Sequence, residues 1–347
     1  MGTMKAAVIR RHGGPESITI EEVPRPTPAK GQVLLAVRAT GLNHLDIWVR
    51  RGGRFQLTWP HVLGSDAAGV VAELGAGVSA LAIGQEVVLS PGLSCGRCEA
   101  CRGRQETLCD AFSIVGTGRP GTFAQFVAVP AGNCLPKPAY LSFEQAGCLA
   151  VAYVTAWRML MTRAGLKAGE TVLIHGIGGG VALAGLQIAK LAGARAIVTS
   201  SSEEKLAKAA KLGADVGLNY RVAADLPAAI RDATGGRGVD VAFETVGAAT
   251  WPVSLAVLCR GGRLVICGVT SGAEAAMNLQ QLYWNQYTIM GSTYGSRDDF
   301  RRLLEAMSKA KMRPVIDSVV PLDHARAATE RMESGQQFGK IVLTIPH

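Results

Sequence analysis

A glycine-rich turn between an apolar strand and an apolar helix is the strongest constraint on how this chain can fold. Residues 171–175 have the apolar character of a strand, residues 180–192 that of a helix, and the segment between them is rich in glycine. Glycines let a backbone approach a pyrophosphate closely, and the free amides and positive dipole end of the following helix attract it. A tight turn without a ligand could use the same residues, but the strand, turn and helix context favours a dinucleotide site. The residues that we expect to contact the cofactor here are Gly176, Gly178, Gly179, Gly180 and Val181.

Strand and helix patterns alternate along the rest of this region. After the first helix the apolar pattern predicts a helix at 203–212 and strands at 196–200, 216–220, 239–244 and 264–267. Such alternation is typical of a doubly wound parallel sheet with helices on its two faces. We therefore predict an α/β fold for this part of the chain.

The N-terminal part has a different pattern, in which short β segments dominate. Strand-like runs at 33–39, 68–74, 86–89 and 122–129 are separated by Gly- and Pro-rich turns, which suggests a small barrel or sandwich. A helix at 297–309 and strand-like segments at 315–321 and 340–345 follow the alternating region, and we expect them to rejoin this β unit. The length of 347 residues, more than twice the roughly 150 of a typical domain, also favours two domains.

The residues at the tip of the second strand bear on which dinucleotide binds. An NAD site usually presents an acidic residue there to the ribose hydroxyls. This chain has Ser200, Ser201 and Ser202 instead, with Lys205 one helical turn later. Hydroxyls and an ammonium can bind a 2′-phosphate that a carboxylate would repel, so we expect NADP(H). Two alternatives stay open: the serines could cap the helix that begins near Glu203, and Glu203 could itself reach a ribose.

Four of the eight cysteines form a metal-binding pattern, Cys95-x2-Cys98-x2-Cys101-x7-Cys109, in a Gly- and Arg-rich loop. Four thiolates at this spacing can close around one tetrahedral zinc with no open position for chemistry, so we expect one structural zinc per chain. An iron–sulfur cluster fits less well, because the ferredoxin run has a shorter spacing before its last cysteine and a proline after it. An empty or oxidised loop is the remaining alternative. The other cysteines stand isolated in apolar surroundings, where small buried thiols are common.

Charge and hydropathy exclude several other classes of protein. The chain has 36 Lys and Arg against 27 Asp and Glu, a net charge of +9, but its basic residues are scattered in short groups. With aromatics at only 5%, it has neither the basic stripe nor the stacking surface that nucleic-acid binding uses. The N-terminal stretch lacks the apolar core of a signal peptide, and the one long uncharged stretch, 171–189, contains His175 and glycines. We therefore expect a cytoplasmic protein that binds neither nucleic acid nor a membrane.

Five features spread over the chain form one pattern. They are the N-terminal β unit, the cysteine loop, a helix with Thr155-Ala156-Trp157, the glycine turn and the strand Gly339-Lys340-Ile341-Val342. Together they resemble the medium-chain dehydrogenase/reductase superfamily, which includes zinc alcohol dehydrogenases and quinone oxidoreductases. The resemblance implies a GroES-like catalytic domain split around a Rossmann domain, with substrate in the cleft between them. In this chain it implies that residues 1–145 and 292–347, with the zinc loop at 92–112, form the first domain, and residues 146–291 the NADP-binding domain.

The chain departs from the zinc alcohol dehydrogenases at the positions of their catalytic zinc ligands. Where those enzymes carry a cysteine, a histidine and a third cysteine or acid, this chain has Asn43, Ser65 and Val151. This is similar to the quinone oxidoreductase branch, which has Asn at the first position and works without catalytic metal, although that branch usually lacks the four-cysteine loop. A catalytic metal site rebuilt from neighbouring residues is the alternative. Its candidate ligands are His44, Asp46, His61, Asp66 and Cys148.

The resemblance also implies roles for further residues. Asn43 would be the polar group nearest the nicotinamide, donating to substrate or ribose, and Thr155 would hold the carboxamide region. Asp46 is the third candidate in the catalytic group, although we favour an ion pair with a nearby arginine over the role of a base. As alternatives, Asn43 could be a turn residue, Tyr220 an ordinary strand-end aromatic and Lys340 a solvated strand residue. The remaining expected cofactor contacts are Tyr220, Val246, Gly247, Gly268, Val269, Thr270 and Lys340.

These observations predict an NADP-dependent oxidoreductase. A catalytic zinc stabilises charge on a substrate oxygen, and without it plain alcohol oxidation is difficult. Quinones and α,β-unsaturated carbonyls need less help, because the arriving charge is delocalised onto a distant oxygen. We therefore expect hydride transfer from NADPH to such an acceptor. The alternatives are a zinc-type alcohol dehydrogenase or carbonyl reductase with a rebuilt site, and an NADPH-binding protein with little turnover.

The resemblance implies a homo-oligomer as well, since relatives are dimers or tetramers. A predicted edge strand at 285–291 could pair across a two-fold axis, which would also protect an exposed sheet edge. We therefore expect a homodimer or a homotetramer.

Overall fold

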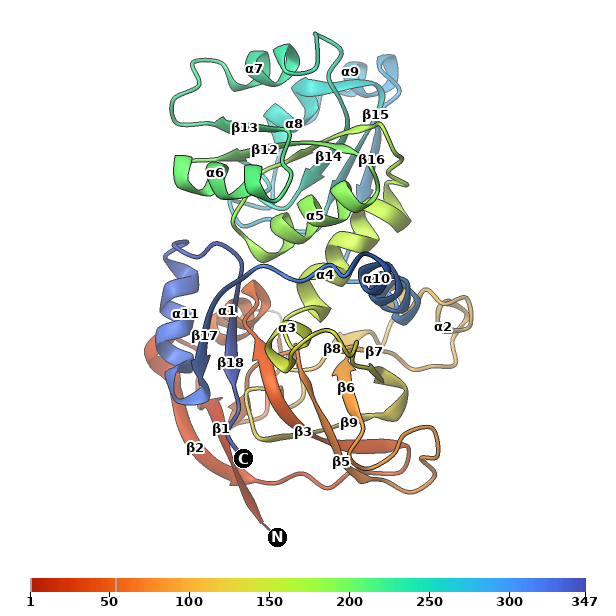
Figure 1. The fold of residues 1–347 in the computed structure, drawn as a ribbon, viewed down its shortest axis with the longest axis vertical. Helices are drawn as coiled ribbons and strands as arrows, with labels where there is room; N and C mark the ends of the chain where they lie inside the picture. The colour runs from red at the N-terminus through yellow and green to blue at the C-terminus, as the bar shows by residue number, and fades with distance from the viewer. Residues whose placement is uncertain (1, 54) are drawn as a thin grey trace. The chain divides into compact units, whose positions relative to one another are not determined.

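The computed structural model describes residues 2–53 and 55–347 of the chain, and it contains two compact units (Figure 1). The first unit comprises Met1–Val154 and Gly295–His347, and the second comprises Thr155–Tyr294. The domain boundaries predicted from the sequence, after residues 145 and 291, lie nine and three residues before those of the two units. In the structure the first boundary falls inside helix α4, Ala150–Trp157, where no change in composition marks it.

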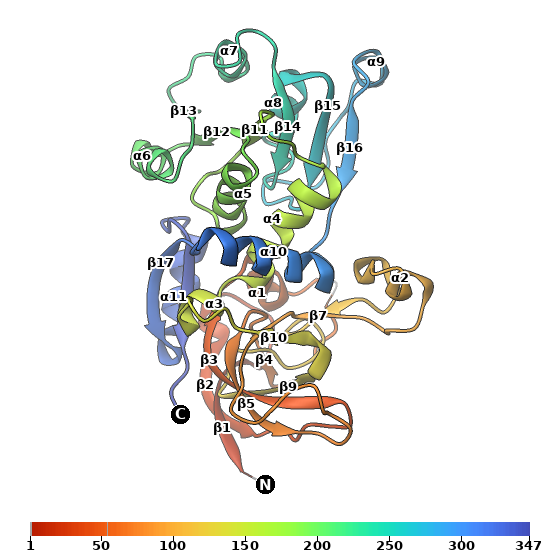
Figure 2. The same ribbon diagram turned by 45° about the vertical axis from the view of Figure 1, so that its right-hand side comes forward.

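The second unit is built on a six-stranded sheet with the order β13-β12-β11-β14-β15-β16. Every neighbouring pair is parallel, which confirms the predicted doubly wound fold; Figure 2 shows β14, β15 and β16 side by side. The central strands are buried along their whole length, as expected when helices cover both faces. The chain order reverses between β11 and β14, where sheets of this type bind ligands at their carboxyl edge. The strands are β11 Thr171–Ile174, β12 Arg195–Ser200, β13 Val216–Asn219, β14 Val239–Glu244, β15 Leu258–Ile266 and β16 Thr288–Gly291.

Helices connect these strands, and local sequence fixes where several of them begin. The side chain of Ser202 accepts the backbone N–H of Lys205 at the start of α6, and Asn278 accepts that of Gln281 at the start of α9. No helix within residues 2–53 and 55–347 is both long and apolar enough to cross a bilayer. The helices of this unit are α5 Gly180–Leu191, α6 Glu203–Lys211, α7 Leu226–Asp232, α8 Trp251–Val257 and α9 Leu279–Trp284.

The first unit is a β structure that the C-terminal segment completes. Its larger sheet has the order β10-β6-β5-β3-β18-β17, with β9 also paired to β3. The C-terminal strand β18 pairs antiparallel with β3, opposing Val342 to Gly41, so the last strand rejoins the N-terminal sheet as predicted. A smaller sheet has the order β2-β1-β4. The strands are β1 Thr3–Ile9, β2 Ile18–Pro24, β3 Gln32–Gly41, β4 His61–Val62, β5 Ala68–Leu74, β6 Glu86–Leu89, β9 Phe126–Pro130, β10 Cys134–Pro136, β17 Ile316–Pro321 and β18 Lys340–Thr344.

An apolar core stabilises this unit and includes side chains from both of its sheets. Val8, Leu35, Val71 and Leu343 are wholly buried members of this core. The burial of apolar side chains is the main favourable term in the free energy of folding of such a unit. The helices of the unit are α1 His44–Arg51, α2 Glu99–Arg102, α3 Phe143–Ala146, α10 Arg297–Ala310 and α11 Ala325–Glu333, and the short strands β7 Gly92–Leu93 and β8 Ser113–Ile114 pair beside the cysteine loop.

Two strands begin four or more residues away from their predicted starts. The segment predicted at 122–129 forms β9 only from Phe126, because Ala124 instead makes a bridge to Ala6 of the smaller sheet. The strand predicted at 264–267 begins at Leu258, because its pairing with β14 continues across a register shift. Gly261 has a φ of +74° within this irregular stretch, a conformation that glycine adopts without strain.

Candidate functional site

The glycine turn of the second unit has the geometry of an anion site. Gly176 and Gly178 have φ values of +65° and +120°, and a Cβ added to Gly178 would lie 2.9 Å from Cδ and 3.4 Å from Nζ of Lys205. Lys205 therefore lies across the turn, and the positive φ at Gly178 is one that residues with a side chain rarely adopt. Gly179 is the N-cap of α5 and offers no side-chain acceptor to the first amides of the helix. Backbone amides, a helix N-terminus and an ammonium thus lie close together here, a combination that can attract an anion.

The predicted adenosine-side residues lie together at the ends of β12 and β13. The hydroxyl of Ser202 accepts the N–H of Lys205 at 3.3 Å, and that of Ser200 accepts the N–H of Ser202 at 3.2 Å. The backbone N–H of Tyr220, a half-exposed residue, donates to the Ser200 carbonyl. Ser202 therefore caps helix α6, which was one of the alternatives considered from the sequence. A hydroxyl that caps a helix can still face a ligand. Glu203 is held by Asn219, whose Nδ2 donates to its carboxylate at 2.7 Å.

The loops after β14 and β15 pack closely against each other. The N–H of Ser271 donates to the Val246 carbonyl at 2.8 Å, and a Cβ on Gly247 would lie 2.6 Å from the Gly272 carbonyl oxygen. Gly268 is equally crowded, with the Thr245 carbonyl 2.8 Å from where its Cβ would be. The predicted cofactor residues of these loops, Val246, Gly247, Gly268, Val269 and Thr270, are thus brought together at the carboxyl edge of the sheet.

Sequence reasoning missed the residue that anchors the first of these loops. Glu244, the last residue of β14, is wholly buried, and its carboxylate accepts the N–H groups of Val246 and Gly247 at 2.7 and 3.0 Å. The signal that could have found it is an acidic residue at the end of an otherwise apolar strand, directly before a glycine-containing loop. Thr155, the predicted carboxamide contact, is buried in α4 of the same unit.

In the first unit, three of the predicted residues and one candidate metal ligand form a buried polar cluster. The Lys340 ammonium donates to the Leu42 carbonyl at 2.6 Å, to Asn43 Oδ1 at 2.5 Å and to Asp66 Oδ2 at 3.2 Å. Asn43 in turn donates from Nδ2 to Asp66 at 2.9 Å and to the Gly41 carbonyl at 3.2 Å. The polar hydrogens of Lys340 and the Asn43 amide thus all have acceptors inside the protein, so neither side chain points a donor at a ligand in this structure.

Asp46 is part of the same cluster, but it does not form the arginine ion pair that the sequence suggested. Its carboxylate accepts the backbone N–H of Asn43 at 2.8 Å, the reciprocal bond of a capping box at the start of α1. No arginine forms an ion pair with it within residues 2–53 and 55–347. Burial raises the pKa of Asp46 to about 7, although the bond from Asn43 and the charge of Lys340 act in the opposite direction.

The positions that correspond to catalytic zinc ligands in zinc alcohol dehydrogenases lie around this cluster. The backbone N–H of Val151 donates to Asp66 Oδ1 at 2.7 Å, while the Ser65 hydroxyl turns away to the Val115 carbonyl. Of the candidate rebuilt ligands, His61 bonds the Gly116 carbonyl and His44 is exposed on α1. Burial raises the pKa of the Cys148 thiol to about 12. Within the described part of the chain, the four-cysteine cluster is the one place where three or more metal-ligating side chains come together, so these candidates do not form a set of that size.

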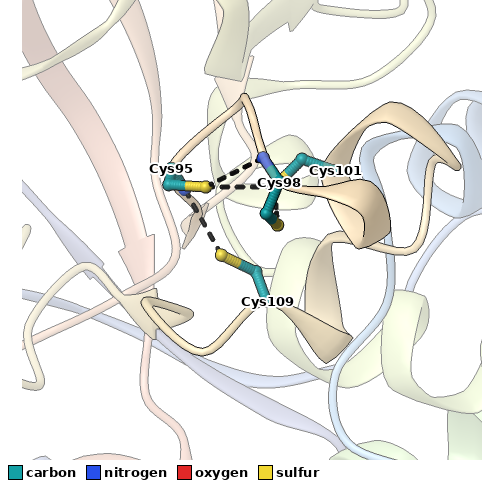
Figure 3. A group of neighbouring side chains, drawn as sticks. All are labelled: Cys95, Cys98, Cys101 and Cys109. Atoms are coloured by element: carbon teal, nitrogen blue, oxygen red, sulfur yellow. Dashed lines mark hydrogen bonds between the residues drawn. The ribbon is translucent and has the colours of Figure 1, made fainter.

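The four-cysteine cluster has the geometry of a zinc site (Figure 3). The sulfur atoms of Cys95, Cys98, Cys101 and Cys109 all lie within 4.8 Å of one another, and the Cys95 and Cys98 sulfurs are 3.9 and 3.5 Å from that of Cys101. Zinc–sulfur bonds of about 2.3 Å in a tetrahedron place the sulfurs about 3.8 Å apart, so the set fits one zinc ion. Backbone N–H groups, that of Arg97 first, lower the pKa of Cys95 to about 6, which favours the thiolate that zinc binds.

The fold and these sites define a dehydrogenase built of two units, one with a parallel sheet of the dinucleotide-binding type and one with a β structure that carries a four-cysteine centre. The chain belongs to the medium-chain dehydrogenase/reductase superfamily. Residues 29–139 match the alcohol dehydrogenase GroES-like domain, and residues 180–309 match the zinc-binding dehydrogenase family. The resemblance and the fold class predicted from the sequence are thereby confirmed.

Similar proteins of known name cover nearly the whole chain. A crystal structure of an NAD-dependent alcohol dehydrogenase is 41% identical, with a TM-score of 0.95, over 99% of this chain and 100% of that one. Crotonyl-CoA carboxylase/reductase of Cereibacter sphaeroides is 32% identical over 96% of this chain and 85% of its own length. Quinone oxidoreductase of Rattus norvegicus is 31% identical over 99% of this chain and 98% of its own length. The chain is therefore an oxidoreductase of this superfamily.

Proposed function

We propose that this oxidoreductase transfers hydride from NADPH to a quinone or an α,β-unsaturated carbonyl, and that it works without a catalytic zinc. The observation that carries the proposal is the buried cluster of Lys340, Asn43 and Asp66. Asn43 stands where zinc alcohol dehydrogenases have a cysteine ligand, and an ammonium ion lies 2.5 Å from its amide oxygen.

A lysine at this place opposes a catalytic metal in two ways. Its positive charge, only 3% exposed, repels a second cation across a short distance in a weakly screened interior. It also takes up the acceptor atoms that a metal would need, since Asn43 Oδ1 and Asp66 Oδ2 both accept from its ammonium. The site therefore has its own fixed cation, which a divalent ion would have to displace.

A site without a catalytic metal favours particular classes of hydride acceptor. NADPH, when bound, supplies a hydride from C4 of its nicotinamide. Without a Lewis acid the protein favours acceptors that spread the arriving charge onto a distant oxygen, as quinones and enoyl thioesters do. The relatives named as quinone oxidoreductase and crotonyl-CoA carboxylase/reductase support these two acceptor types. In this proposal Asn43 and Asp46 hold the start of α1 and the position of Lys340, and Thr155 contacts the carboxamide region.

The preference for NADP(H) is proposed from the second unit. Lys205 lies over Gly178, and the hydroxyls of Ser200 and Ser202 stand at the tip of β12 where an NAD site has an acid. The nearest acid of this tip, Glu203, is engaged by Asn219. We propose that Lys205 and the serines bind the 2′-phosphate, that the glycine turn binds the pyrophosphate, and that Tyr220 and the loops after β14 and β15 complete the contacts.

Zinc analysis combined with an acceptor panel tests this proposal. Protein purified without added metal or chelator is expected to contain one zinc per chain, bound by the cysteine cluster, and to oxidise NADPH with quinones, enones or enoyl thioesters. Two zinc ions per chain with alcohol oxidation would overturn it in favour of an alcohol dehydrogenase. One zinc with tight NADPH binding and no turnover on any acceptor would overturn it in favour of a binding protein.

We also propose that the chain forms a homodimer or homotetramer through the open edge of its parallel sheet. Strand β16 lies at that edge, and the neighbouring helix α9 exposes Leu279, Tyr283 and Trp284 to between 66% and 70%. An unpaired strand beside exposed aromatic residues favours pairing with a second copy, which would cover both.

A further inference from the structure

A chain of buried polar side chains runs beneath the carboxyl edge of the parallel sheet. Nδ1 of His175 lies 3.0 Å from Thr199 Oγ1, and its Nε2 lies 3.2 Å from Ser254 Oγ. The Ser254 hydroxyl donates to Glu244 Oε2 at 2.9 Å. Each of the four residues is 1% exposed or less, with Glu244 and Ser254 at 0% and His175 and Thr199 at 1%.

The carboxylate at one end of this hydrogen-bonded path determines which group donates in each of its hydrogen bonds. A carboxylate only accepts hydrogen bonds, so Ser254 donates to Glu244 and must accept from Nε2–H of His175. Nδ1 of His175 then carries no proton and accepts the hydroxyl of Thr199. Burial lowers the pKa of His175, against the influence of the Glu244 charge, which keeps the ring neutral as this arrangement requires.

The four residues join the three strand ends from which the cofactor loops begin. His175 follows β11 and directly precedes Gly176 of the glycine turn, and Thr199 directly precedes Ser200 on β12. Glu244 ends β14 and holds the N–H groups of Val246 and Gly247. These strands are neighbours in the order β12-β11-β14, so one continuous hydrogen-bonded path crosses the sheet under the glycine turn.

We propose that His175, Thr199, Ser254 and Glu244 are positioning residues that set the three cofactor loops at one mutual distance. This inference rests on the proposed binding of NADP(H) by those loops. None of the four touches the dinucleotide in the proposal; they act through Gly176, Ser200 and the Val246-Gly247 segment. A dinucleotide spans all three loops, so a displacement of one strand end weakens contacts at both others.

Two substitutions at Thr199 separate a positioning role from a packing role. Thr199→Val keeps the shape of the side chain but removes the hydroxyl, whereas Thr199→Ser keeps the hydroxyl but removes a methyl group. If the hydrogen bond positions the loops, Thr199→Val should weaken NADPH binding about three- to tenfold and Thr199→Ser should leave it near the wild-type value. If Thr199 only packs, Thr199→Ser should weaken NADPH binding more than Thr199→Val does, because the lost methyl group opens a cavity.

Ser254→Ala provides a second break in the same path, and Cys259→Ala a matched control. Cys259 is also buried in this sheet and contacts Asp240, near the opposite ends of the strands. We expect Ser254→Ala to weaken NADPH binding to a similar degree as Thr199→Val, and the double variant to lose little more than either, because a serial path is already broken by one change. Cys259→Ala should lower the melting temperature without changing NADPH affinity.

The outcomes distinguish this inference from the proposed function on which it rests. Fluorescence titration of the folded variants with NADPH, beside the melting temperature of each ligand-free protein, is the measurement. Wild-type protein that binds neither NADPH nor NADH would overturn the proposed function. Wild-type protein that binds NADPH, with Thr199→Val and Ser254→Ala binding equally well, would overturn the positioning path alone.

Discussion

Replacing Lys340 by methionine tests the buried cluster most directly, because it removes a positive charge but keeps an unbranched side chain. The Lys340 ammonium lies 2.6 Å from the Leu42 carbonyl, 2.5 Å from Asn43 and 3.2 Å from Asp66. After the substitution, wholly buried Asp66 keeps the N–H donors of Asn43 and Val151 but loses its counter-charge. Removing one partner of a buried ion pair costs about 3 to 5 kcal/mol, and we expect the free energy of unfolding to fall by that amount.

Urea unfolding followed by circular dichroism measures this loss, and Lys190→Met is its matched control. Lys190 forms an ion pair of 2.7 Å with Asp215, but the two side chains are 31% and 35% exposed. A partly exposed pair contributes at most about 1 kcal/mol, so the same substitution should have a small effect there. The double variant Lys340→Met/Asp66→Asn should lose less than the sum of its single variants, because no uncompensated charge remains buried.

One result would refute the reasoning. If Lys340→Met and Lys190→Met change the unfolding free energy equally, the ammonium of Lys340 does not compensate a buried carboxylate, and the argument against a catalytic metal loses its basis. Because the two units can unfold in separate transitions, each variant is compared with the wild type in the transition of its own unit. For Lys340→Met this is the transition that Asp66→Asn also shifts, and for Lys190→Met it is the transition of the second unit.

Four further outcomes test other parts of the structure. Burial raises the pKa of Asp46 to about 7, so between about pH 4 and pH 7 this residue holds a proton in the folded state but not in the unfolded state. The stability of the wild type in urea should therefore fall as the pH rises through this window, and Asp46→Asn should make the dependence on pH weaker. Equal pH profiles for the two proteins would contradict the assignment. Cys109→Ser should remove the zinc measured by elemental analysis and lower the melting temperature, while Cys259→Ser, at a buried thiol elsewhere, should retain the metal; retention by both would contradict the zinc site. Lys205→Ala should weaken NADPH binding about tenfold in fluorescence titrations and NADH binding less, and equal losses would argue against a 2′-phosphate contact. Trp284→Glu, on the exposed face of α9, should lower the mass found by light scattering, and an unchanged mass would place the interface elsewhere.

Features that are local in the sequence could be predicted because their geometry depends on few other parts of the chain. The cysteine cluster is formed within a loop of fifteen residues, Cys95 to Cys109, so spacing alone indicates a tetrahedral site. The glycine turn follows from one strand and one helix, and helix α5 begins at Gly180 as expected. The capping box of Asn43 and Asp46 was equally local, and its spacing could have prevented the incorrect expectation of an arginine partner.

The polar networks could not be predicted, because they depend on strand order. Lys340 and Asp66 are 274 residues apart and meet only because β18 pairs with β3. His175, Thr199 and Ser254 come together because β11 pairs with β12 and β14 in the sheet, and α8, which carries Ser254, packs against β14. Serine and threonine occur in many turns and caps, so their types alone give no sign that they share one hydrogen-bonded path.

The two buried carboxylates, Asp66 and Glu244, show two ways of stabilising charge away from water. Both are 0% exposed, but Asp66 accepts from the ammonium of Lys340, whereas Glu244 accepts from neutral N–H and O–H groups. No cation within residues 2–53 and 55–347 forms an ion pair with Glu244. A lysine beside Glu244 would form an ion pair with it near the glycine turn. Neutral donors add no such ion pair, so Lys205 and the N-terminus of α5 provide the positive potential that an anion would meet there. The difference agrees with the two proposals made above: a fixed internal cation in the unit for which we propose no catalytic metal, and neutral compensation in the unit for which we propose an anionic cofactor.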